Sequence, residues 1–153
     1  MNKVLNYILI FSLFVLLSCD YKPILSDKNY KFSVNVNKLN GDEKINTTII
    51  NNFYYLKDKE KKYDLDLSTI KEKNIISKDS KGDPSVFELI IKVNYIVKKD
   101  GKTLIVNNIN RKTTYNNIAD KFELENYEKN IISNLTRNIS DKIISSISEI
   151  NEW

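Results

Sequence analysis

The chain has 153 residues, a net charge of +4, a single cysteine and no histidine. This length suits one domain rather than two. The lysines are interleaved with acidic residues along the chain, so the small positive excess does not indicate a nucleic-acid partner. Without histidine and with one cysteine, the sequence lacks the usual general base and excludes internal disulfides and thiolate metal sites, so we expect neither an enzyme nor a cofactor.

The first 18 residues have the features of a bacterial export signal. Lys3 lies near the start, and residues 4–17 form an apolar stretch of about 14 residues, which is shorter than the roughly 20 that a membrane-spanning helix needs. The sequence Leu-Leu-Ser-Cys at 16–19 is typical of a lipobox, where a cysteine is lipidated and becomes the new N-terminus. We therefore expect a covalent lipid on Cys19, a tether over 19–29 and one domain over 30–153. The alternative is that Cys19 is a small apolar residue in an uncleaved anchor.

The spacing of apolar residues predicts the first elements of this domain. Alternation predicts a half-buried strand with Tyr30, Phe32, Val34 and Val36 on one face. After Gly41, helical spacing appears in Ile45, Ile49, Phe53 and Leu56. Asn40 or Asp42 would be a suitable N-cap for this helix. The lysine-rich residues 57–62 are interpreted as a solvated loop.

Three further strands are predicted after this loop. Apolar and polar residues alternate over 63–68, in a strand expected to continue to about Ile76, and they alternate again over 87–97. Asp100-Gly101 then gives a strong signal for a tight hairpin turn. A return strand is expected over about 102–115.

The last element is a long amphipathic helix. Apolar residues recur every three or four positions from Tyr127 to Ile150, with Asp120 or Asn117 near the start of the helix. The resulting order is β-α-β-β-β-α. It predicts an α+β two-layer sandwich, in which two helices cover one face of a four-stranded, mostly antiparallel sheet.

Two short motifs and the order of elements resemble a known family. Cys-Asp-Tyr-Lys-Pro-Ile-Leu at 19–25 looks like the mature start of the LPS-assembly lipoprotein LptE of alphaproteobacteria. Tyr-Asn-Asn at 115–117, between the last strand and the long helix, is similar to a motif of the same family. The resemblance implies an outer-membrane lipoprotein that plugs the LptD barrel, helps it to fold and contacts lipopolysaccharide (LPS) on its way to the cell surface. It implies no catalysed reaction.

One position departs from the family pattern. Asp20 follows the cysteine where family members usually carry glycine, and an aspartate there favours inner-membrane retention in some enteric bacteria. The expected location is the periplasmic side of the outer membrane, with the inner membrane as the alternative. A second functional hypothesis is also kept: an auxiliary lipoprotein of another envelope lipid-transport system.

Five cationic residues are candidates for contact with LPS phosphates: Lys98, Lys99, Lys102, Arg111 and Lys112. The three lysines flank the predicted hairpin turn, which we expect to project beyond the core and away from the tether. An ordinary soluble turn is the alternative for the lysines. Protection of an edge strand is the alternative for Arg111 and Lys112.

Two pairs of aspartates have simpler interpretations than a functional site. Asp64 and Asp66 project from the same side of a predicted strand, and a solvated face explains them better than a catalytic carboxylate pair. Asp79 and Asp83 flank a glycine, but their spacing fits no calcium-binding loop. They predict a turn.

Overall fold

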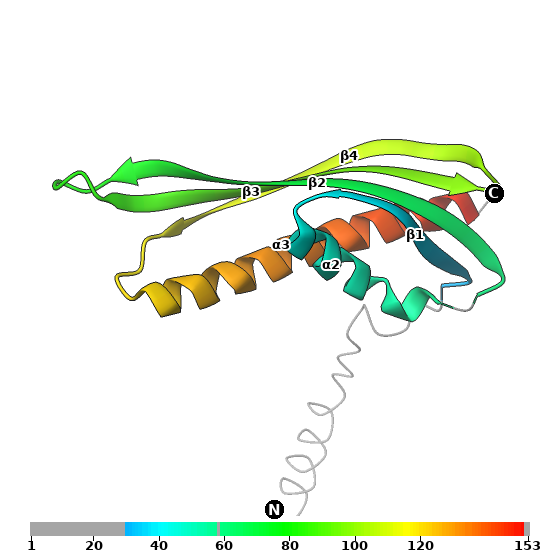
Figure 1. Cartoon of the computed structure of the whole chain (residues 1–153), viewed down its shortest axis with the longest axis horizontal. Helices are drawn as coiled ribbons and strands as arrows, with labels where there is room; N and C mark the ends of the chain where they lie inside the picture. Colours follow the sequence, from blue (N-terminus) through cyan, green and yellow to red (C-terminus); the bar gives the residue numbers. More distant parts are fainter. Residues whose placement is uncertain (1–29, 58, 152–153) are drawn as a thin grey trace, which may run out of the picture.

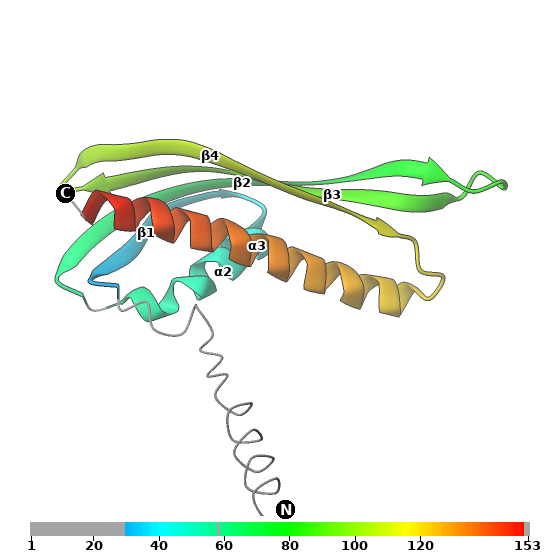
Figure 2. The same cartoon turned by 180° about the vertical axis from the view of Figure 1, so that it is seen from behind.

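The computed structural model describes residues 30–57 and 59–151, so Cys19 and the predicted signal and tether lie outside the described residues. The elements, in chain order, are β1 (Phe32–Gly41), α2 (Glu43–Asn52), the 3-10 helix η1 (Tyr54–Leu56), β2 (Lys61–Lys78), β3 (Pro84–Lys99), β4 (Lys102–Asn116) and α3 (Lys121–Asn151). The strands form a sheet in the order β1-β2-β3-β4, in which β1 is parallel to β2 and the other neighbours are antiparallel. Both helices lie on the same face of this sheet (Figure 1 and Figure 2). The predicted α+β two-layer sandwich, with the order β-α-β-β-β-α, is confirmed.

The junction between β1 and α2 depends on a glycine and a helix cap. Gly41 has a φ of +92°, and a side chain there would meet the carbonyl oxygen of Thr69 at 1.8 Å, so both the backbone angle and the space require glycine. Asp42 caps α2 by accepting a hydrogen bond from the Ile45 amide at 3.0 Å, so one of the two predicted N-caps is confirmed. Burial raises the pKa of Asp42, but that amide and the Lys71 ammonium outweigh burial and lower the pKa below its usual value.

The core lies between the sheet and the helices and has two unequal parts. Every second side chain of β2 and β3 points toward the helices, as the alternating burial of these strands shows. The larger cluster joins β1, α2 and the second half of α3 to the sheet, and its centre includes Ile45, Leu65, Val97 and Ile143. The smaller cluster has three buried residues, Phe87, Leu89 and Tyr115, which pack against the first half of α3. The long helix therefore contacts both parts of the core.

The strands β2, β3 and β4 extend past β1 as a three-stranded arm, in which β3 is the middle strand. β2 pairs with β1 only as far as Thr69, and beyond this residue it pairs with β3 alone. The arm ends in a turn at residues 79–83, at the opposite end of the sheet from the start of β1 (Figure 1). The Asp79 carboxylate accepts hydrogen bonds from the Lys81 and Asp83 amides, both at 2.9 Å, so the predicted turn is confirmed.

The long helix begins beside this arm and returns along the sheet. Asp120 accepts a hydrogen bond from the Glu123 amide at 2.9 Å, which confirms it as a residue that stabilises the helix start. Within residues 30–57 and 59–151, neither α2 nor α3 is both long enough and apolar enough to cross a bilayer.

Candidate functional site

One end of the sandwich brings four segments together: the starts of β1 and β2, the β3–β4 turn and the C-terminal end of α3 (Figure 1, right). Pairing fixes this arrangement, because Phe32 lies beside Lys61 and Asp64 lies beside Lys98. We call this the tether end, since Tyr30, the first described residue after the predicted tether, lies here.

The predicted lysine turn does not project away from the tether, so that expectation is wrong. Because β1 is parallel to β2, both strands start at the tether end, and β3 brings the chain back to it before the turn at Asp100-Gly101. The turn that projects away is the one at 79–83. The lysines of the β3–β4 turn and Tyr30, the first described residue, therefore lie at the same end of the molecule.

The five cations proposed to contact LPS do not form one cluster. Lys98 and Lys112 lie on the outer face of the sheet, which is the face opposite the helices. Lys98 donates a hydrogen bond to Asp66 at 2.7 Å, and Lys112 donates one to Glu88 at 3.2 Å. Both ammonium groups are therefore already paired with a carboxylate from the neighbouring strand.

The other three cations have different surroundings. Lys99 and Lys102 flank the turn and lie opposite each other in register, and neither forms an ion pair with a residue that the structure describes. Arg111 pairs in register with the buried Ile91, so it lies on the helix-facing side of β4 and is separated from Lys112 by the sheet. β4 is an edge strand, which fits edge protection by these last two residues. Contact with LPS stays a prediction for all five.

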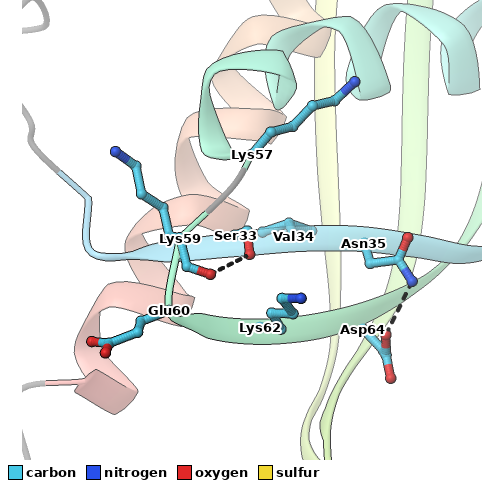
Figure 3. A pocket seen from close by; sticks show the side chains of 8 residues that line it. All are labelled: Ser33, Val34, Asn35, Lys57, Lys59, Glu60, Lys62 and Asp64. Carbon is cyan, nitrogen blue, oxygen red and sulfur yellow. Dashed lines mark hydrogen bonds between the residues drawn. The ribbon is translucent and has the colours of Figure 1, made fainter.

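A groove of about 700 Å³ opens beside β1 at the tether end (Figure 3). It is formed by the first residues of β1 and β2 and by the segment that precedes β2. The lining residues are Ser33, Val34, Asn35, Lys57, Lys59, Glu60, Lys62 and Asp64. We call it the lysine groove, because three of these residues are lysines and two are acidic.

Two hydrogen bonds hold the walls of the lysine groove. The Ser33 hydroxyl donates to the Lys59 carbonyl oxygen at 3.3 Å, which ties the segment before β2 to β1 (Figure 3). The Asn35 amide donates to the Asp64 carboxylate at 3.3 Å. Neither of these two contacts uses a lysine side chain, so they leave the ammonium groups of the groove available.

The lysines of the groove are not neutralised within the described part of the chain. The Lys57 ammonium lies 4.5 Å from the centre of the Tyr54 ring, a cation–π contact that keeps its charge. Lys59 and Lys62 form no ion pair with a described residue. The interpretation of 57–62 as a solvated loop missed this groove, which depends on the pairing of β1 with β2.

The two strand aspartates have separate partners. Asp64 accepts a hydrogen bond from Asn35 and Asp66 accepts one from Lys98, so the two carboxylates do not share a proton or a substrate position. Within residues 30–57 and 59–151, no three histidine, cysteine or acidic side chains come together as they would around a metal ion.

The Tyr-Asn-Asn motif forms a corner between β4 and α3. The Tyr115 ring packs on Phe87, with 5.6 Å between the ring centres, and its hydroxyl donates to Glu128 on α3 at 2.7 Å. Lys73 on β2 donates to the same carboxylate at 2.5 Å. Asn117 donates through its backbone amide to the Ser85 carbonyl oxygen at 2.8 Å. The motif thus connects β2, β3, β4 and α3.

Charge stabilises this corner. Burial raises the pKa of Glu128, but the hydrogen bonds from Lys73 and Tyr115 outweigh burial and lower the pKa below its usual value. Burial and the adjacent Glu128 carboxylate raise the pKa of Tyr115. Glu128 is therefore charged and Tyr115 neutral at neutral pH, which is the pairing that the hydrogen bond requires. The motif acts in the fold rather than presenting free groups to a ligand.

The fold is similar to those of solved bacterial lipoproteins. Rare lipoprotein B from Shewanella oneidensis matches with a TM-score of 0.58 at 15% identity, over 76% of this chain and 96% of that one. Uncharacterized lipoprotein B from Nitrosomonas europaea matches with a TM-score of 0.56 at 12% identity, over 82% of this chain and 90% of that one. A minor lipoprotein from Acinetobacter baumannii matches with a TM-score of 0.51 at 12% identity, over 74% and 92%. No protein-family model and no curated protein sequence matches the chain. At these identities the similarity establishes the fold alone.

Proposed function

We propose that the chain is a lipid-anchored envelope protein of LPS assembly, which plugs and helps to fold an LptD-like outer-membrane barrel. The observation that carries the proposal is the place of Cys19. This lipobox cysteine lies eleven residues before Tyr30, where a domain with the fold of solved bacterial lipoproteins begins. The resemblance of residues 19–25 and 115–117 to LptE supplies the finer assignment to LPS assembly.

The outer face of the sheet supports the proposed role as a plug. Three ion pairs cross between neighbouring strands on this face: Lys98–Asp66, Lys92–Glu72 and Lys112–Glu88. The lumen of an outer-membrane barrel is polar, so a body inside it needs a polar surface of this kind. The exposed Ile70 and Val106 lie on the same face, so the support comes from the ion pairs and not from the whole surface.

Contact with LPS is assigned in this proposal to the β3–β4 turn. Lys99 and Lys102 have no carboxylate partner among the described residues, so their ammonium groups can bind phosphate without breaking an existing pair. Lys98 would first have to leave Asp66. We therefore rank the two turn lysines above Lys98 and Lys112, which are already paired with carboxylates.

Co-purification from membranes tests the proposal. The tagged full-length chain should be recovered with a lipid on Cys19 and with a barrel of the size of LptD, both identified by mass spectrometry. Cys19→Ala is the matched control and should leave an uncleaved or lipid-free chain. Fractionation of the inner and outer membranes, followed by detection of the tagged chain in each, decides between outer-membrane anchoring and the inner-membrane retention that Asp20 would favour.

Two outcomes would contradict the proposal in different ways. A free thiol at Cys19 in an unprocessed chain would exclude the lipid anchor. If the lipidated chain co-purifies with components of another lipid transporter and without a barrel, the chain is an auxiliary lipoprotein of that transporter and has no role in LPS assembly.

A further inference from the structure

Two exposed tyrosines extend the lysine groove into a larger surface. The Tyr54 and Tyr55 side chains of η1 are 71% and 55% exposed. Tyr54 lies under the Lys57 ammonium, and the Tyr55 ring lies 6.2 Å from the ring of Tyr30. The two tyrosines therefore connect the lysine groove to the point where the described chain begins. We call the combined surface of Tyr54, Tyr55, Lys57, Lys59 and Lys62 the tyrosine–lysine face.

The composition of this face is that of a surface which meets lipid headgroups. Tyrosine is amphipathic and is enriched at the boundary between membrane and water. Lysines attract the phosphates of anionic lipids, and their long stems let the charge reach the headgroups. Residues 54–62 contain four lysines and two acidic residues, so this short stretch holds half of the net charge of the chain.

The length of the preceding chain places a bilayer within reach of this face. Eleven residue steps separate Cys19 from Tyr30, and a fully extended chain of that length spans at most roughly 36–40 Å. A lipid on Cys19 would therefore hold the tether end close to the membrane surface. The turn at 79–83 lies at the opposite end of the sheet, so the two ends of the molecule would face different surroundings.

We propose that the tyrosine–lysine face docks on the anionic surface of the membrane that carries the lipid anchor. The inference rests on the proposed lipidation of Cys19, because the tether brings the face to the bilayer. Each lysine at an anionic surface strengthens binding by roughly fivefold. This is weak for a free domain but sufficient when an anchor already holds the domain at the surface. Docking would fix the orientation of the domain relative to the membrane.

The test uses the protein purified from membranes after expression of the full-length chain, in two kinds of vesicle. One kind contains phosphatidylcholine alone, and the other contains phosphatidylcholine and phosphatidylglycerol at roughly 3:1. Flotation with the vesicles reports the anchor. Acetylation by a membrane-impermeant reagent, read by mass spectrometry, reports the exposure of Lys57, with the exposed Lys121 at the far end of α3 as internal reference.

The expected result is flotation with both vesicles and protection of Lys57 only on the anionic ones. Its acetylation should slow by roughly threefold or more relative to Lys121, and high salt should remove the difference. The double change Lys59→Glu and Lys62→Glu should abolish the protection while flotation continues. The matched control is the double change Lys78→Glu and Lys81→Glu, at exposed positions near the other end of the sheet. It should leave the protection of Lys57 unchanged.

Three outcomes would overturn the inference. Flotation with both vesicles but equal acetylation of Lys57 on both would exclude docking and leave the proposed function intact. Protection that requires added LPS and does not occur with phosphatidylglycerol would make the face an LPS site instead. Failure to float with either vesicle would mean that no anchor exists, so both the proposed function and the docking would fall.

Discussion

Tyr115→Phe should lower the free energy of unfolding by about 1–2 kcal/mol at pH 7. The change keeps the ring between Phe87 and Tyr127 and removes only the hydroxyl that donates to Glu128 at 2.7 Å. A hydrogen bond to a charged group contributes roughly 1.5–3 kcal/mol. The loss should fall in the lower part of this range, because the Glu128 side chain is 22% exposed and keeps its bond from Lys73.

The size of this loss should depend on pH, because Glu128 is the acceptor. Its pKa in the folded chain lies below the ordinary value of 4.5. The stability that it contributes is therefore present above about pH 4.5 and is lost as the pH falls through the folded pKa. Once the carboxyl is protonated, the Tyr115 hydroxyl no longer has a charged acceptor. The difference between the variant and the parent should shrink from pH 7 to pH 3.

Urea denaturation followed by circular dichroism measures both effects. Tyr54→Phe is the matched control, since that side chain is 71% exposed and its hydroxyl has no partner among the described residues, and it should leave stability unchanged. Unfolding of Tyr115→Phe at the same urea concentration as the parent at pH 7 would refute the proposed contribution of the hydroxyl. A loss of equal size at pH 3 would show that the charge of Glu128 does not contribute.

Three further changes test other parts of the fold. Ile143→Ala, at a fully buried position of the larger cluster, should lower the free energy of unfolding by about 2–5 kcal/mol in the same assay, and a loss below about 1 kcal/mol would mean that α3 packs differently. Gly41→Ala should greatly reduce the yield of folded protein, whereas Gly82→Ala, at a similar φ but in open space, should cost only about 1 kcal/mol. Lys98→Glu should lower the melting temperature, because it places a second carboxylate beside Asp66, whereas Lys102→Glu should not. Equal melting temperatures for the two variants would argue against the ion pair between Lys98 and Asp66.

The element order and most element limits could be predicted from the sequence, because burial follows simple periods. Alternation over 87–97 predicted β3, and the recurrence of isoleucines up to Ile150 predicted α3. The position of the lysine turn was predicted wrongly because the direction of β1 was not considered. A helix between two neighbouring strands is typical of parallel pairing, so α2 carried the missing signal.

The candidate site could be predicted only in part. The lysine groove joins residues 33–35 to residues 57–64, and these segments become neighbours only through the pairing of β1 with β2. The partner of Lys98 lies 32 residues away on another strand, and its identity depends on the register of β2 against β3. Periodicity shows which face a residue occupies. It does not show which residue of the next strand lies beside it.

The unequal core divides the molecule into two units of different local stability. Seventeen buried residues hold the tether-end unit, whereas three hold the arm that β2, β3 and β4 form beyond β1. Segments with few buried contacts open at a lower cost than the whole domain, so backbone amides of β2 beyond Thr69 should exchange their hydrogens with solvent sooner than those near Leu65. α3 runs through both units and keeps them aligned. The arm can therefore adjust its shape to a neighbouring protein while the anchored half stays folded.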